Sequence, residues 1–254
     1  MKQLMKSLIV AFSMYSKIPM PRFIWDSEDM KYHLVFFPLV GGVIGLLEYI
    51  WFQLNTVLSF NLLLYTMIAF VIPLLITGGF HLDGFLDTQD ALHSYQNRER
   101  KLEILKDPHI GAFAIISLLI YVCFAFGFIG YINQTTIVCM CAGFVYSRIC
   151  SGISVTYFPK AKKDGMVVTS SKTEDKTWVG KILIVEFVFV TMILFFVCDI
   201  STVLIEWATI QLTFFYYYYK SKKEFGGITG DLAGWFVCVS ELAVLIVLAV
   251  WKGF

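Results

Sequence analysis

The sequence predicts an all-α protein, a polytopic integral membrane helix bundle. Apolar residues make up 58% of the 254 positions, and the mean hydropathy of +0.73 is too high for a soluble globular domain. Apolar runs close to the ~20 residues that a transmembrane helix needs recur along the chain. Lys and Arg gather in alternate loops, which is typical of cytoplasmic segments. We therefore expect about seven transmembrane helices with the polar loops on the cytoplasmic side.

The predicted spans follow one another with short connections, in one domain over residues 1–254 with no linker long enough to divide it. They cover residues 34–54, 60–80, 110–132, 135–158, 181–198, 201–219 and 232–251. Before them, an amphipathic helix is expected in the headgroup layer, because Leu4, Leu8 and Phe12 can share one face. The six cysteines lie within predicted spans without metal-site spacing, so we expect small buried hydrophobes.

The distribution of basic residues supports this topology. With the N-terminus inside, all of the 20 basic residues except Arg148 and Lys252 fall in segments placed on the cytoplasmic side. The loops that carry motifs are then cytoplasmic as well.

Three carboxylates mark the loop after the second predicted span. Asp83, Asp87 and Asp90 are spaced so that a helix would place them on one narrow face. Like charges there repel unless a cation lies between them, and Mg²⁺ takes carboxylate oxygens together with substrate phosphates. The alternative is a solvated acidic face beside the bilayer. His81 lies two residues before Asp83, and nearby glycines would let a ligand approach the backbone, so we favour a metal site.

Further candidates lie where spans begin or within them. Lys106 and Asp107 precede the third span, where a helix N-terminus would attract an anion. Arg148 lies inside a span and needs a polar cavity or an acidic partner, with Glu48, Glu186, Glu206 and Glu241 all open as partners. The segment FGGITGD, residues 225–231, has glycines that permit close backbone approach, and Asp231 lies at or near the N-cap of the last span.

These segments together resemble one known family. The motifs are TGGFHLDGFLDTQDAL, RKLEILKDPHIGAFA, the Ser147–Arg148 pair followed by YFPKAKKDGM, and FGGITGDLAGWFVCVSELAVL. Their order and spacing resemble the cobalamin synthase family, also called adenosylcobinamide-GDP ribazoletransferases. FSMYSKIPMP and FFPLVGGVIG extend the resemblance over nearly the whole chain.

The resemblance implies an enzyme of the prokaryotic cell (inner) membrane, with cytoplasmic active-site loops, that completes the nucleotide loop of cobalamin. It would join adenosylcobinamide-GDP to α-ribazole or α-ribazole 5′-phosphate, release GMP and require Mg²⁺. The implied metal ligands are Asp83, Asp87 and Asp90, and Asp83, His81 and Asp87 are the catalytic candidates, with His81 or a carboxylate accepting the hydroxyl proton. The implied substrate-binding residues are Lys106, Asp107, Arg148, Lys160, Gly226, Gly227, Thr229, Gly230 and Asp231.

Other functions remain open at this level. A CDP-alcohol phosphotransferase or a prenyl-diphosphate transferase also uses acidic clusters with Mg²⁺, although its usual spacing differs. A transporter would use Arg148 and the intramembrane glutamates as a path, although no second copy of the acidic motif is present. We expect small-molecule substrates and a lipid bilayer as partners and no nucleic acid, and a homo-oligomer is compatible with the sequence.

Overall fold

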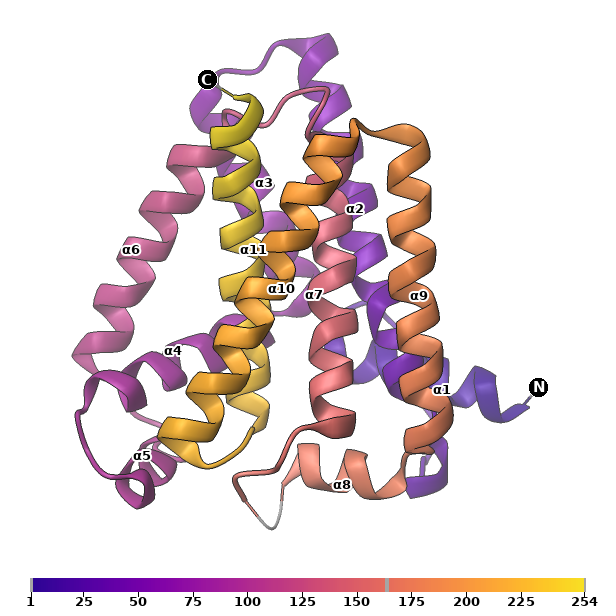
Figure 1. Ribbon diagram of the computed structural model, residues 1–254, viewed down its shortest axis with the longest axis vertical. Helices are drawn as coiled ribbons and strands as arrows, with labels where there is room; N and C mark the ends of the chain where they lie inside the picture. The colour runs from indigo at the N-terminus through magenta and orange to yellow at the C-terminus, as the bar shows by residue number, and fades with distance from the viewer. Residues whose placement is uncertain (1, 163–164, 254) are drawn as a thin grey trace.

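The computed structural model describes residues 2–162 and 165–253, and this part of the chain is helical apart from loops and one isolated β-bridge (Figure 1). Lys163, one of the predicted cytoplasmic basic residues, lies outside it. The elements are α1 (Lys2–Tyr15), η1 (Ser27–Met30), α2 (His33–Leu58), α3 (Leu62–Thr77), α4 (Phe80–His93), α5 (Arg98–Ile104), α6 (Ala112–Ile129), α7 (Ile137–Tyr157), α8 (Met166–Thr173), α9 (Lys176–Val197), α10 (Ile200–Lys220), the π-helical turn η2 (Ser221–Phe225) and α11 (Gly230–Lys252). The predicted all-α class is confirmed.

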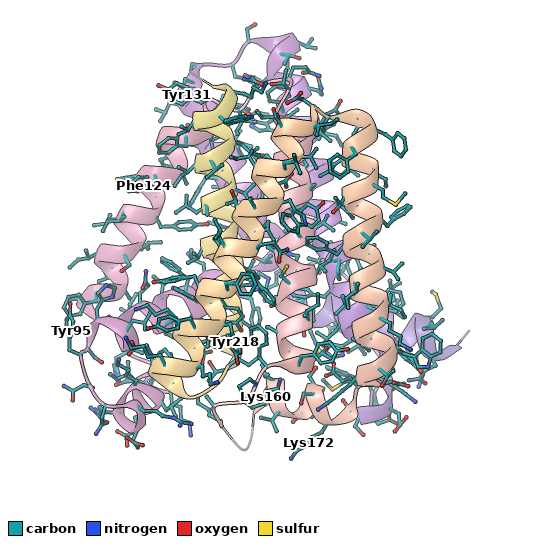
Figure 2. All side chains as sticks on the ribbon, in the orientation of Figure 1. Tyr95, Phe124, Tyr131, Lys160, Lys172 and Tyr218 are labelled. Carbon is teal, nitrogen blue, oxygen red and sulfur yellow. The ribbon has the colours of Figure 1, made fainter. Side chains whose placement is uncertain are left out.

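The long helices run beside one another, and the short ones gather at one end of the bundle. Figure 1 shows α1, α4, α5 and α8 at the lower end, while the α2–α3, α6–α7 and α9–α10 connections and the C-terminus lie at the upper end. Figure 2 places Lys160 and Lys172 at the lower end and Tyr131 at the upper end. We call the lower end, formed by α1, α4, α5, α8 and η2, the polar end.

Large apolar side chains cover the outside of the bundle. On α6 they include Ile116, Leu119 and Phe124, and Figure 2 shows Phe124 projecting away from the other helices. On α9, Val188 and Phe196 are exposed in the same way. Soluble monomers do not expose apolar surfaces of this extent, so the surface is suited to lipid.

Fewer helices than the expected seven are long and apolar enough to cross a membrane. Within the described residues, α2, α6, α7, α9 and α11 are long and apolar enough to cross a membrane, and the bent pair α3–α4 would add a sixth. The run predicted over residues 201–219 does form α10, but Glu206, Gln211 and its tyrosines lower its hydropathy. The polytopic bundle is confirmed, and the count of seven is not.

Two glycines lie between α3 and α4. Gly78 and Gly79 have φ angles of 67° and 78°, in the left-handed region that favours glycine. The chain turns there, and the two helices meet at 96°. As a result α4, with its three aspartates, lies across the polar end of the bundle (Figure 1).

The predicted amphipathic helix and the cysteine assignment are only partly as expected. The helix forms as α1, with Ala11, Phe12 and Tyr15 buried against the bundle, although Leu4 is half exposed.

All six cysteines are free, but Cys123 is exposed on α6 and only Cys139, Cys150 and Cys238 are buried. Cys123 therefore corrects the expectation that every cysteine is buried.

Glycine also sets the central contact between α2 and α7. A Cβ atom at Gly41 would lie 2.2 Å from the Phe144 carbonyl oxygen, and one at Gly45 would lie 2.7 Å from the Cys141 carbonyl oxygen. The two backbones can approach this closely only because neither position has a side chain. The contact holds Arg148, on the same stretch of α7, inside the bundle.

We expect Gly41→Ala to destabilise the protein by about 1–3 kcal/mol, because the added methyl group forces two backbones apart. The matched control is Gly42→Ala, since a Cβ atom there meets nothing within 4 Å. The stability of the Gly42→Ala variant should be unchanged or slightly higher. Thermal unfolding in detergent measures both, and equal unfolding temperatures for the two variants would contradict the close packing.

Candidate functional site

The site depends on the contact between α4 and α11. A Cβ atom at Gly84 would lie 2.7 Å from the Asp231 carbonyl oxygen, and one at Gly234 would lie 3.1 Å from the His81 carbonyl oxygen. Each helix thus presents a glycine to the backbone of the other. The two motifs that are about 150 residues apart in the chain, HLDG and TGD, become neighbours at the polar end.

A second close contact brings in the segment after α7. A Cβ atom at Gly227 would lie 2.4 Å from the Pro159 carbonyl oxygen. The Ile228 amide donates to Pro159 and the Ala161 amide donates to Ile228, at 2.8 and 2.9 Å. Residues 159–161 therefore pair with Ile228 along the backbone, which carries Lys162 to the two acidic motifs.

These contacts form an open pocket at the polar end, of about 810 Å³ including the space open to solvent. Its polar lining is Asp83, Lys162, Thr229 and Asp231, and we call it the acidic pocket. Thr229 is the N-cap of α11, because its hydroxyl accepts from the Leu232 amide at 3.2 Å and donates to Asp231 at 3.3 Å. Asp231 lies in the first turn rather than at the cap itself.

The three aspartates of α4 share a helix, as expected, but they have different surroundings. Asp83 is exposed and Asp87 is half-buried, and neither carboxylate makes a hydrogen bond to the described residues. Burial, followed by the charges of Asp83, Asp231 and Asp90, raises the pKa of Asp87 to about 6, and Lys162 opposes this rise. Asp87 lies outside the lining of the acidic pocket, but it is close enough for the charges of Asp83 and Asp231 to raise its pKa.

Asp90 is engaged with the start of α6. Its two carboxylate oxygens accept hydrogen bonds from the amides of Gly111 and Ala114, at 2.6 and 2.8 Å. A helix N-terminus has free N–H groups, and a carboxylate there satisfies them. Asp90 thereby anchors α6 to α4.

The two lysines predicted to bind phosphate, Lys106 and Lys160, both lie outside the lining of the acidic pocket. The Lys160 ammonium donates to the carbonyl oxygens of Val155 and Phe158 at the end of α7, and burial lowers its pKa to about 8. Lys106 is exposed and does not line the acidic pocket, and Asp107 accepts hydrogen bonds from the His109 amide and ring. Among the described lysines, Lys162 lines the acidic pocket, and only its place in the KAKK run could have indicated it.

His81 is buried rather than exposed beside the aspartates. Its side chain is 5% exposed, and both ring nitrogens lack a hydrogen-bond partner in the described structure. Burial, followed by the charge of Arg148, lowers its pKa well below the usual range. His81 is therefore a neutral imidazole between the acidic pocket and the interior of the bundle.

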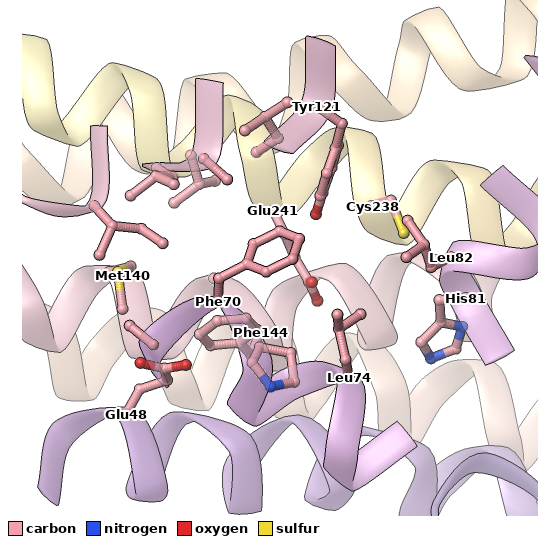
Figure 3. A pocket seen from close by; sticks show the side chains of 18 of the residues that line it. Glu48, Phe70, Leu74, His81, Leu82, Tyr121, Met140, Phe144, Cys238 and Glu241 are labelled. Atoms are coloured by element: carbon pink, nitrogen blue, oxygen red, sulfur yellow. The ribbon is translucent and has the colours of Figure 1, made fainter. Parts of the chain in front are cut away.

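Arg148 has an acidic partner inside the bundle. Its guanidinium donates to Glu241 on α11, to the Phe144 carbonyl oxygen at 2.8 Å and to the Ser147 hydroxyl at 3.0 Å. Of the four open partners the structure selects Glu241, and it leaves Glu48 and Glu206 without an ion pair. Figure 3 shows Glu241 beside Tyr121 in an internal cavity, with Glu48 at one end and His81 at the other.

Taken together, the fold and the site define a polytopic helical membrane protein that gathers carboxylates and a lysine at one end of its bundle. The chain belongs to the cobalamin-5-phosphate synthase family, whose model matches residues 7–249. This family is the one that the sequence motifs resemble, and the CDP-alcohol, prenyl-diphosphate and transporter alternatives are not favoured.

Curated relatives cover nearly the whole chain. An adenosylcobinamide-GDP ribazoletransferase of Lachnoclostridium phytofermentans is 39% identical over 249 residues, which cover 98% of this chain and 95% of the relative. Proteins with the same name from Clostridium perfringens strain SM101 and from Fusobacterium nucleatum are 34% and 28% identical, and they cover 98% and 97% of this chain and 100% and 98% of their own. No solved structure matches the chain.

The donor set of the acidic pocket fits Mg²⁺ when the metal is shared with a substrate. No group of three or more His, Cys, Asp or Glu side chains in residues 2–162 and 165–253 is arranged to hold a metal by itself. Mg²⁺ does not require such a cage, because it commonly takes one or two carboxylates, several waters and substrate phosphates. Asp83 and Asp231, which line one pocket and have no full charge partner, are the suitable pair.

We expect Glu241→Gln to destabilise the protein by about 3–5 kcal/mol, because it leaves the buried Arg148 charge without its partner. Glu186→Gln is the control, since Glu186 is half-buried on α9 and forms no ion pair. Unfolding in detergent should separate the two variants clearly. Equal stabilities would show that the Arg148–Glu241 pair is not formed.

Asp90→Ala should lower the free energy of unfolding by about 1 kcal/mol, because α6 loses the acceptor for two of its first amides. Asp87→Ala removes a carboxylate without a hydrogen bond and should not destabilise the protein at pH 7.5. Denaturant titration of both variants in detergent measures the difference. A larger loss in Asp87→Ala would contradict the anchoring role of Asp90.

Proposed function

We propose that this protein is an Mg²⁺-dependent adenosylcobinamide-GDP ribazoletransferase, which joins adenosylcobinamide-GDP to α-ribazole or its 5′-phosphate. The observation that carries the proposal is the acidic pocket, where Asp83, Asp231 and Lys162 meet through the α4–α11 contact. Relatives that cover nearly the whole chain bear this name. A pocket with both unneutralised carboxylates and a lysine suits a diphosphate with its metal ion.

In this proposal Asp83 and Asp231 hold Mg²⁺ and Lys162 contacts the diphosphate of the donor. When bound, the metal supplies charge neutralisation for the diphosphate. The backbone of Gly230, which also lines the pocket, lets the phosphates approach closely. Gly226 and Gly227 act at a distance, because their contacts position the loop that carries Thr229 and Gly230.

The reaction transfers the cobinamide phosphoryl group to the acceptor. The ribazole 3′-hydroxyl oxygen forms a bond to the phosphorus that bears the cobinamide arm, and the bond from this phosphorus to the bridging oxygen breaks. GMP leaves with that electron pair, and the hydroxyl proton passes to a carboxylate. We assign this role to Asp87, which lies one helical turn from Asp83 and makes no hydrogen bond to the described residues. Buried His81 is less accessible to the hydroxyl.

The proposed location is the cell membrane, with the polar end in the cytoplasm. The polar end carries Lys17, Lys101 and Lys160, and it also carries the lysines of α8 and η2. At the opposite end, the basic residue within the described chain is Lys252, which pairs with Asp199 at 3.7 Å. The positive-inside rule supports this orientation.

Purified protein should release GMP from adenosylcobinamide-GDP only when both an α-ribazole acceptor and Mg²⁺ are present. Asp83→Asn should reduce the rate at least about 100-fold, because a metal contact contributes several kcal/mol to the transition state. The control is Glu103→Gln, an exposed acid of α5 that pairs with Arg100. Release that ignores the acceptor or persists in EDTA would refute the proposed reaction.

A further inference from the structure

A second pocket adjoins the acidic pocket on the side of the bundle interior. Its lining includes Tyr15, Phe37, Phe80 and His81, and we call it the aromatic pocket. It measures about 430 Å³ including the space open to solvent. Phe80, Val167 and Gly230 line both pockets, so the two pockets are neighbours that share these three residues as a wall.

The rings around this pocket form a continuous cluster. Tyr15 and Phe37 have centroids 4.2 Å apart, and His81 lies 5.7 Å from Phe37 and 5.4 Å from Phe80. Rings at these distances form walls against which a planar heteroaromatic ring can stack. The tyrosine comes from α1, the phenylalanines from α2 and α4, so three elements converge on the pocket.

His81 supplies a polar group that has no partner of its own. Its ring is buried, and neither nitrogen finds a hydrogen-bond partner in the described structure. Leaving a buried donor unpaired is costly, so a ligand that accepts a hydrogen bond from His81 would gain affinity. The other polar side chains of the lining are few, and one of them, Ser170, is already hydrogen-bonded to His33 at 3.0 Å.

We propose that the aromatic pocket binds the dimethylbenzimidazole base of the ribazole acceptor, with His81 donating to its unsubstituted ring nitrogen. The proposal rests on the proposed function, and it adds the subsite that selects the acceptor. The base is planar and apolar and has a single acceptor nitrogen, which matches the rings and the one unpaired imidazole. A guanine base would leave several edge groups unpaired in this lining.

This placement also fits the reaction. With the base in the aromatic pocket, the attached ribose lies at the shared wall of Phe80, Val167 and Gly230. The 3′-hydroxyl then faces the acidic pocket, where Asp83 and Asp231 lie. The donor diphosphate and the acceptor base occupy adjoining pockets and do not compete.

The first test fills the aromatic pocket. Ala233 lines it on α11, so Ala233→Leu should raise KM for the dimethylbenzimidazole nucleotide at least about tenfold. KM for an imidazole nucleotide should rise less, and KM for the donor should stay within about twofold. The matched control is Ala142→Leu, a residue of equal burial on α7 beside an unrelated surface hollow.

The second test removes the hydrogen bond and keeps the ring. Wild type should prefer the benzimidazole acceptor over the indole analogue, which lacks the acceptor nitrogen, and His81→Phe should abolish that preference. A structural role of His81 alone would lower turnover of both acceptors equally. Unchanged base selectivity in both Ala233→Leu and His81→Phe, with a working wild type, would overturn the subsite and leave the proposed function intact.

A third measurement does not depend on variants that fold. An azido-benzimidazole cross-linked by light to wild-type protein should label peptides that contain Phe37, Phe80 or Ala233. Labelling elsewhere would overturn the subsite. Absence of GMP release with every acceptor would instead refute the proposed function, so the two failures are distinguishable.

Discussion

The glycine-mediated crossing of α4 and α11 is the contact on which the site depends. Gly84 lies against the backbone of Asp231, and Gly234 lies against the backbone of His81. Any side chain at these positions would move α4 away from α11. Asp83 and Asp231 would then no longer line one pocket, although each helix could still form. The short distance between the two acidic motifs is a consequence of two absent side chains.

The buried charge of Arg148 and the charges of Asp83 and Asp87 at the polar end differ in their hydrogen-bond partners. Inside the bundle, Arg148 is paired with Glu241 and bonded to Ser147, because an unpaired guanidinium in hydrocarbon is costly. At the polar end, Asp83 and Asp87 make no hydrogen bond to the described chain. Water can solvate them there until a substrate arrives. The site keeps its unneutralised charge where the cost of doing so is lowest.

The helices could be predicted from the sequence because each long apolar run is a local property. All seven predicted runs contain a helix, and the helical face shared by Asp83, Asp87 and Asp90 was also foreseeable from spacing. The different surroundings of the three aspartates could not be predicted from their spacing. Asp90 differs from its neighbours only because α6 begins beside it, which is a tertiary contact.

The same reason explains why Lys162, and not Lys160, lines the acidic pocket. Lys160 and Lys162 are two residues apart in one basic run, and nothing in the run distinguishes them. Lys160 turns back onto the end of α7, whereas Lys162 reaches the acids because the chain pairs with Ile228 between them. The partner of Arg148 was equally undecidable, since four intramembrane glutamates were available and only packing selects Glu241.

The position of the site at the junction of bundle and polar end has a physical reason in the proposed substrates. A donor diphosphate needs charge and water, whereas a dimethylbenzimidazole base is apolar and gains by leaving water. The acidic pocket and the aromatic pocket meet at Phe80, where α4 begins after the turn at Gly78 and Gly79. That turn sets the aspartates toward the polar end and His81 toward the apolar interior. A helix that continued straight from α3 would carry both faces into one environment, and it could not serve two substrates of opposite polarity.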